Sequence, residues 1–220
     1  MSDSNLLTAS VTERLKDLPR HLETQDDFAD VLAALAEGNS ATCDGVWGSS
    51  CALLAASLAH HAAGPLVVVL PHPQVIDDLL SDVSLFSDRH VLRFPAWESD
   101  PGEHLIDDDL YADRLRVLKL LHDARQNSPD LPFESQLAES RRWAPIIVTS
   151  IQSLLQPSPE PAAVQQNTKR IHVGDNHDID NLMKWLVSNR FHSTTAVELP
   201  GEFSSRGGIL DIFAPDWDQP

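Results

Sequence analysis

The spacing of apolar residues changes along the chain between a helical and a strand pattern, which is typical of an α/β fold. One helical face follows i, i+3, i+4, i+7 spacing at Phe28, Val31, Leu32 and Leu35. Gly38 is expected to end this helix. The alanine- and leucine-rich residues 51–63 predict a second helix with a face for close packing.

Three short apolar runs predict strands at residues 66–70, 90–94 and 146–150. The first run is apolar on both faces, as expected of a buried parallel strand. Helical patterns lie between the runs, and parallel strands require such crossovers. The sequence therefore predicts a parallel sheet with helices.

The remaining pattern suggests a division of the chain into an N-terminal extension and two domains. Residues 1–40 carry scattered leucines, and a short helix there is expected to end at Pro19. Residues 41–160 hold the predicted sheet, a helix at about 110–124 and a polar surface insertion at 126–144. Prolines 157, 159 and 161 and the polar residues up to 167 mark the boundary, and a partial, smaller α/β domain covers residues 166–220.

The smaller domain opens with a predicted strand at residues 169–173, followed by a helix with an apolar stripe that begins at Ile179. A second strand is expected at residues 209–213. Gly207 and Gly208 precede it and permit a tight turn with positive φ.

Arg206 stands directly before this turn, and two interpretations of it remain open at the level of spacing. It either pairs with Glu202 or Asp211 as a structural arginine, or it is displayed as a contact residue. Arginine is favoured in contacts because its guanidinium binds acidic groups in a bidentate manner.

The charge balance narrows the possible functions. The formal net charge is −17, from 33 acidic and 16 basic side chains, which disfavours unaided binding to DNA or RNA. The two cysteines, Cys43 and Cys51, form no CxxC pair and fit a reducing compartment. Neither a signal peptide nor an apolar run long enough to cross a membrane is found, so we expect a cytoplasmic protein.

Residues 45–52 have the position of a phosphate-binding loop before a helix but not its chemistry. That loop needs a second glycine, a lysine and a hydroxyl residue to hold phosphates and magnesium. Gly45 and Gly48 are present, but the three required positions carry Ser50, Cys51 and Ala52. A loop that leads into a packed helix is therefore the favoured interpretation, and ATP binding is not expected here.

Other candidate chemistry does not follow a recognisable ligand or catalytic spacing. The acidic residues between Glu98 and Asp109 lack the glycine and ligand order of a calcium loop, and the ten histidines lack metal-ligand spacing. Ser49, Ser50 and Cys51 do not form a nucleophile elbow. We predict no catalytic residue and no metal site.

Four phrases, in order along the chain, resemble the N-terminal UvrB-like region of the transcription-repair coupling factor family. They are residues 64–70, Phe94-Pro95-Ala96-Trp97-Glu98, residues 147–156, and Pro200-Gly201-Glu202-Phe203 with Arg206-Gly207-Gly208-Ile209-Leu210-Asp211-Ile212-Phe213. The degenerate loop at 45–52 is similar to coupling factors and differs from UvrB. UvrB also carries a tyrosine-rich hairpin for DNA, whereas this sequence contains one tyrosine, Tyr111.

The resemblance implies an α/β domain 1A at 41–160 similar to half of a helicase motor, and a UvrA-binding domain 2 at 166–220. It also implies that Arg206, Gly207 and Gly208 contact UvrA. Further contact residues of the family, an arginine and a phenylalanine, are expected beyond Pro220, so the chain resembles a truncated N-terminal piece.

In that family the whole protein releases RNA polymerase stalled at DNA lesions by ATP-driven translocation and recruits nucleotide excision repair. The resemblance implies that RNA polymerase, DNA, ATP and Mg²⁺ bind to parts outside this sequence, which leaves a non-catalytic interaction module. The alternative is a fragment of an ATP-dependent excision-repair enzyme of the UvrB or helicase type.

Overall fold

A computed structural model describes residues 3–97, 109–126 and 144–217. The chain forms two compact units, one from residues 1–94 and 128–154 and the other from 95–127 and 155–220. Within the described residues, no helix combines the length and the apolar character needed to cross a membrane.

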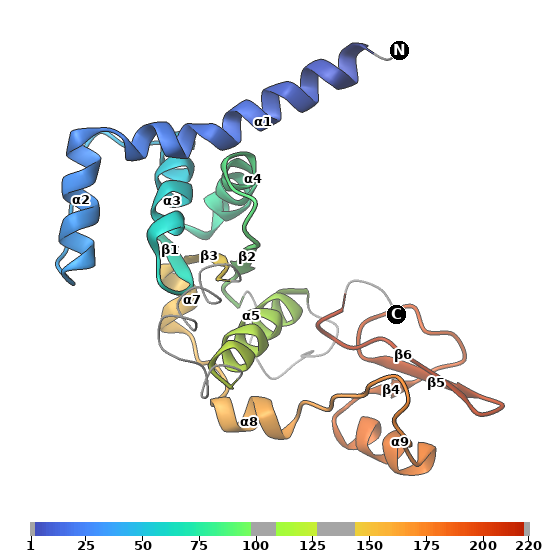
Figure 1. The fold of residues 1–220 in the computed structure, drawn as a ribbon. Coiled ribbons are helices and arrows are strands. Elements are labelled where there is room, and N and C mark those ends of the chain that lie inside the picture. Colours follow the sequence, from blue (N-terminus) through green and yellow to red (C-terminus); the bar gives the residue numbers. More distant parts are fainter. Residues whose placement is uncertain (1–2, 98–108, 127–143, 218–220) are drawn as a thin grey trace. The chain divides into compact units, whose positions relative to one another are not determined.

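A three-stranded parallel sheet is the centre of the first unit, as the sequence predicts (Figure 1). Its strands are β1 (Leu66–Leu70), β2 (Val91–Phe94) and β3 (Ile146–Ser150), in the order β1-β3-β2. Val148 of β3 lies opposite Val68 of β1 and Arg93 of β2. Every residue of the central strand is buried, which explains its continuous apolar pattern.

Helices of the first unit follow the predicted amphipathic pattern. They are α1 (Asp3–Glu23), α2 (Asp26–Ala36), α3 (Ser49–His61), the 3-10 turn η1 (Pro73–Val75), α4 (Ile76–Phe86) and α7 (Ile151–Leu155). Gly38 follows α2 with a φ of 81°, as expected of a residue that ends a helix. The alanines of α3 pack against Leu79 and Val83 of α4 and against β3. Their small side chains allow the two helices to approach closely.

The prediction that residues 66–70 are buried on both faces is wrong. Leu66, Val68 and Leu70 pack against the core formed with α3 and α4. Val67 and Val69 point to the other face of the strand and are 50% and 41% exposed. The difference arises because both core helices of this unit cover the same face of β1.

The predicted end of the first helix at Pro19 is also wrong, because α1 continues to Glu23. Proline has no N–H to donate and normally disrupts a helix interior. Pro19 is almost completely buried, and its carbonyl oxygen accepts a hydrogen bond from Ser57 Oγ of α3 at 3.3 Å. Tertiary packing against α3 thus offsets the missing helical hydrogen bond.

The second unit combines helices with a small mixed sheet. Its elements are α5 (Asp109–Gln126), α8 (Pro161–Gln166), α9 (Ile179–Ser188), β4 (His192–Ser193), β5 (Glu202–Arg206) and β6 (Ile209–Ile212). The strand order is β4-β5-β6, with β4 parallel and β6 antiparallel to β5. Leu182 and Leu186 of α9 pack on Phe203 of β5 to form the core.

Two local predictions for this unit are wrong. Residues 169–173 form no strand; Ile171 and Val173 are exposed, and no strand lies beside them among the described residues. Alternation of apolar residues is insufficient for a strand without a neighbour to complete its hydrogen bonds. The polar residues after Pro161 form α8, because proline at the first helical position is favourable.

Residues 126–144, predicted as a surface insertion, lie almost entirely outside the described residues, as does most of the acidic run from Glu98. The predicted domains follow the chain in order, whereas the compact units interleave, since residues 95–127 pack with the C-terminal part. The assignment of domains at 41–160 and 166–220 stays a prediction.

Candidate functional site

The candidate site is the tip of the hairpin that β5 and β6 form. Arg206 lies opposite Ile209 in the register, so Gly207 and Gly208 are the two residues of the turn. Their φ angles are 56° and 89°. A two-residue hairpin turn with positive φ at both positions matches the twist of the strands, and glycine adopts it without steric cost. The sequence thus specifies the turn that displays Arg206.

The two faces of the hairpin differ in burial. Phe203, Leu210 and Ile212 belong to the core side of the second unit. Directly opposite residues share a face, so Arg206, Ile209 and Asp211 lie on the other side, where all three are exposed. The tip therefore presents a cation beside an exposed apolar side chain.

The structure separates the two interpretations of Arg206. Among the described residues, Arg206 forms an ion pair with neither Glu202 nor Asp211. The Glu202 carboxylate instead accepts hydrogen bonds from the backbone N–H groups of Glu198 and Leu199, at 2.8 and 2.9 Å. These bonds, first of all that from Glu198, hold the pKa of Glu202 below its ordinary value. The guanidinium of Arg206 is thus displayed to solvent, and its assignment as a UvrA contact stays a prediction.

The loop at residues 45–52 differs in detail from a phosphate-binding loop. Gly45 and Gly48 both have positive φ, and α3 begins at Ser49. The N–H groups of Ser50 and Cys51 donate to the carbonyl oxygens of Trp47 and Gly48, at 3.2 and 3.0 Å. Backbone N–H groups that hold a phosphate must point at it, whereas these two already have partners within the turn.

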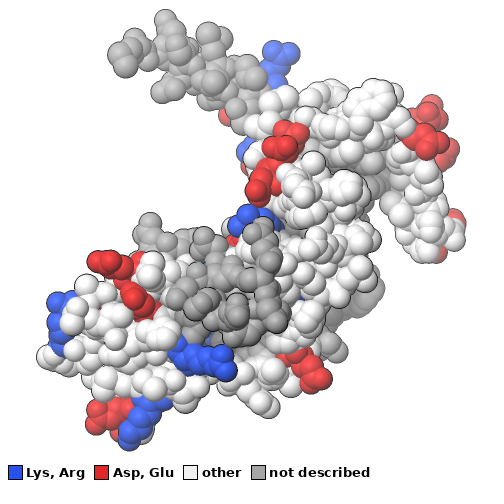
Figure 2. Space-filling view, turned by 180° about the vertical axis from the view of Figure 1, so that it is seen from behind, with Lys and Arg blue, Asp and Glu red and all other residues white. Residues whose placement is uncertain are grey.

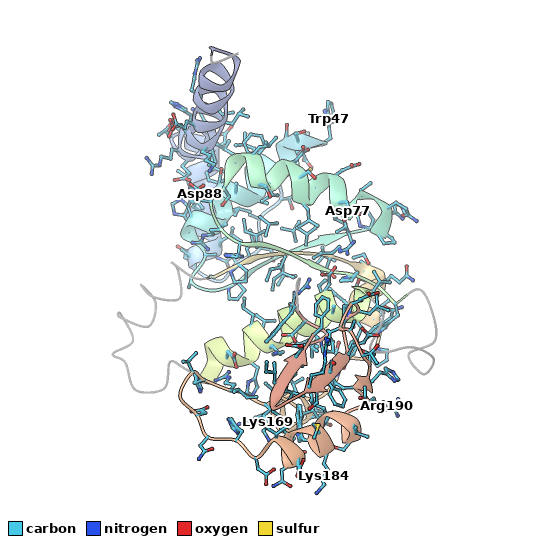
Figure 3. The ribbon with its side chains drawn as sticks, turned by 90° about the vertical axis from the view of Figure 1, so that its right-hand side faces the viewer. Trp47, Asp77, Asp88, Lys169, Lys184 and Arg190 are labelled. Carbon is cyan, nitrogen blue, oxygen red and sulfur yellow. The ribbon has the colours of Figure 1, made fainter. Side chains whose placement is uncertain are left out.

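Side chains around this loop also fit a nucleotide poorly. Ser49 Oγ donates to Oδ2 of Asp82 at 2.6 Å, which places a carboxylate beside the start of α3. Ala52 is fully buried, and Cys51 packs against the core. Trp47 projects from the loop and is exposed (Figure 3). The carboxylate would repel a phosphate, and the loop offers no hydroxyl at Ala52 to hold Mg²⁺. The predicted absence of nucleotide binding here stays a prediction.

A buried arginine on α5 is a feature that the sequence reasoning missed. Arg114 is 1% exposed and donates to the carbonyl oxygens of Pro95 at 2.7 Å and Pro157 at 3.2 Å. Its guanidinium also lies 4.7 Å from the ring centroid of Trp97, which stacks on Tyr111 at 5.8 Å. Burial lowers the pKa of Arg114. The available signal was its helical spacing of three residues from the buried Val117.

Gln156 completes this arrangement, which we call the Arg114 clamp (Pro95, Trp97, Arg114, Gln156 and Pro157). The Trp97 N–H donates to Gln156 Oε1 at 2.5 Å, and Gln156 Nε2 donates to the Trp97 carbonyl oxygen at 3.0 Å. The side-chain amide thus satisfies both backbone groups of one residue, as a neighbouring strand would. Two of the phrases that carry the resemblance therefore have a structural role.

Charge on the molecular surface is dispersed. In Figure 2, lysine and arginine atoms form small separate groups interspersed with acidic ones on the face that is shown. Among the described side chains, no group of three or more histidines, cysteines or carboxylates has an arrangement that would hold a metal ion. The hairpin tip is thus a better candidate for protein contact than for nucleic-acid binding.

Comparison with known proteins places this site in a family. Residues 170–220, which include the hairpin, match the family model of the UvrB interaction domain. The chain is 35% identical over 171 residues to the transcription-repair-coupling factor of Mycobacterium tuberculosis, which is 76% of the chain and 13% of that protein. The Bacillus subtilis factor is 26% identical over 212 residues, covering 94% and 16%, respectively.

A third relative, the factor of Myxococcus xanthus, is 29% identical over 200 residues, which is 88% of the chain and 15% of that protein. The chain thus spans about a seventh of the length of the relatives it matches. The similarity extends over both compact units, and the domain match coincides with the hairpin region. The chain belongs to the transcription-repair-coupling factor family and corresponds to its N-terminal, UvrB-like region.

Proposed function

We propose that the chain is a non-catalytic interaction module that recruits nucleotide excision repair by contacting UvrA through Arg206, Gly207 and Gly208. The observation that carries this proposal is the exposed Arg206 at a turn fixed by two glycines with positive φ, inside the segment that matches the UvrB interaction domain. A rigid turn presents its cation with little loss of conformational entropy on binding, which favours affinity.

The first unit supports a second part of the proposal, in which it is a helicase-motor-like domain without nucleotide chemistry. Its parallel sheet and its loop before α3 have the arrangement of such a domain. The carboxylate of Asp82 and the buried Ala52 occupy the places where phosphate and magnesium would require other groups. In the complete family protein, release of stalled RNA polymerase and ATP-driven translocation on DNA would then belong to parts outside this sequence, in the cytoplasm.

Replacing Arg206 by alanine is expected to weaken binding to UvrA by about tenfold or more, since an arginine at an interface centre contributes about 2 kcal/mol. Isothermal calorimetry with purified UvrA and the 220-residue chain measures the change. The fold should be unaffected because Arg206 is exposed and makes no ion pair among the described residues.

Lys184→Ala is the matched control for this experiment, since it removes an exposed cation from α9 of the same unit. Its affinity for UvrA should stay within about twofold of the unchanged chain. Equal loss in the two variants would indicate general charge attraction and contradict the assignment of Arg206. A chain that binds UvrA with or without Arg206 equally well would contradict it too.

Calorimetry with Mg-ATP provides a separate test of the first unit. We expect no binding, or binding weaker than about 1 mM, because the N–H groups of Ser50 and Cys51 are already paired and Asp82 lies beside them. Micromolar affinity that is lost when Gly48 is replaced by valine would instead favour the ATP-dependent enzyme.

A further inference from the structure

The second unit contains a cavity that the hairpin site does not use. Its volume is about 310 Å³, and its walls come from α5, α8, α9 and the C-terminal residues after β6. Most of the lining is apolar, including Leu115, Val164, Leu182, Trp185, Phe191 and Pro215. The cavity lies on the core side of the sheet, where Ile212 contributes to it, whereas Arg206 is on the opposite face of the hairpin.

The cavity carries two lysines with different surroundings. Lys119 Nζ pairs with Oδ2 of Asp216 at 2.5 Å, so its charge is compensated within the wall. Lys169 is exposed on the segment between α8 and α9, and its Nζ lies 5.5 Å from the centroid of the Trp185 ring (Figure 3). Among the described residues, no carboxylate forms an ion pair with Lys169. The cavity therefore has one uncompensated cation, in a chain whose net charge is −17.

Apolar surface continues beyond the cavity. Ile171 and Trp217 line it and are also exposed. An exposed apolar rim around a cavity is typical of a surface that binds another protein. A small molecule would fill the cavity and leave this rim uncovered, whereas a peptide segment would cover both.

We propose that this cavity binds an acidic peptide segment of a partner protein, which inserts one large apolar side chain between α5 and α9 and places a carboxylate at Lys169. The volume is at the lower end of the range for ligand pockets, which fits one side chain better than a cofactor. A carboxylate at Lys169 would complete an ion pair above the apolar anchor, and such anchors dominate the affinity of interfaces.

A fluorescein-labelled pentapeptide with one phenylalanine between two pairs of glutamates tests the proposal by fluorescence anisotropy with the 220-residue chain. We expect saturable binding, and at least about tenfold weaker binding when the phenylalanine is replaced by alanine. Replacing the glutamates by glutamines should also weaken binding. Absence of binding, or equal binding of the alanine peptide, would overturn the proposal.

Two substitutions locate the binding. Lys169→Glu reverses the charge at the cavity, and Ala163→Trp fills the cavity from α8; each should weaken binding by about tenfold or more. Lys184→Glu makes the same charge change on α9 away from the cavity lining and should leave affinity within about twofold.

Melting temperature and the unchanged response of UvrA binding to Arg206→Ala identify variants that remain folded. Equal effects of Lys169→Glu and Lys184→Glu would show attraction by overall charge and overturn the assigned site. Because UvrA binding is measured separately on the opposite face of the hairpin, failure of one proposal leaves the other standing.

Discussion

Replacing Arg114 by alanine is expected to destabilise the second unit by about 3 kcal/mol. The substitution removes charge-assisted hydrogen bonds to the carbonyl oxygens of Pro95 and Pro157 and the contact with the Trp97 ring. It also leaves a space in a buried position, which adds the cost of a cavity. Urea unfolding followed by tryptophan fluorescence measures the loss, because Trp97 lies in the clamp.

Two further variants show whether the geometry of the Arg114 clamp or only its charge is responsible. Arg114→Lys keeps the charge but cannot reach both carbonyl oxygens with one planar group, so it should recover only part of the stability. Arg170→Ala removes an arginine whose partner, Asp123, is at the surface, and should cost about 0.5 kcal/mol or less. If Arg114→Ala unfolds at the same urea concentration as Arg170→Ala, the clamp does not stabilise the unit.

Leu186→Ala should be similarly damaging, with a loss of about 3 kcal/mol in the free energy of unfolding. Leu186 is 2% exposed and packs with Leu182 and Phe203 between α9 and the sheet. Its neighbour Val187 is 60% exposed, so Val187→Ala provides a control on the same helix with an expected cost of about 0.5 kcal/mol or less.

Hydrogen exchange of the β5 amides checks the effect of Leu186→Ala locally, since β5 forms the other side of this core. Faster exchange in β5 for Leu186→Ala, with Val187→Ala unchanged, is the expected result. Protection that remains equal in both variants would show that the sheet does not depend on α9. Binding of UvrA should fall together with this protection, because the hairpin tip needs β5 and β6 in register.

Elements with a strong apolar periodicity were predictable from the sequence. The stripe that begins at Ile179 is the helix α9, and the uniformly apolar residues 146–150 are the buried central strand. The turn at Gly207 and Gly208 was predictable because only glycine adopts both positive φ angles easily. In each of these cases the local preference and the tertiary environment agree.

Predictions failed where tertiary packing decides between local alternatives. Pro19 is tolerated inside α1 because its position is buried beside Ser57, which no local pattern reveals. The segment at 169–173 alternates like a strand but has no neighbouring strand to pair with among the described residues. Arg114 looked like a surface residue of a helix, since its partners Pro95 and Pro157 are distant in the sequence.

The candidate site was predictable only in part. Spacing alone left open whether Arg206 pairs with Glu202, and the structure shows that backbone N–H groups occupy that carboxylate instead. The cavity beside Lys169 left no recognisable mark in the sequence, because its walls come from segments between Tyr111 and Trp217 that are far apart along the chain.

The strand order β1-β3-β2 has a consequence for synthesis on the ribosome. β1 and β2 pair with β3 and not with each other, and β3 is the last of the three strands to be made. Until residue 150 has left the exit tunnel, both earlier strands expose unpaired edges and the apolar faces of α3 and α4 lack their sheet. The nascent chain should therefore depend on chaperones most strongly in this interval, and a pause in translation before residue 146 should increase its aggregation.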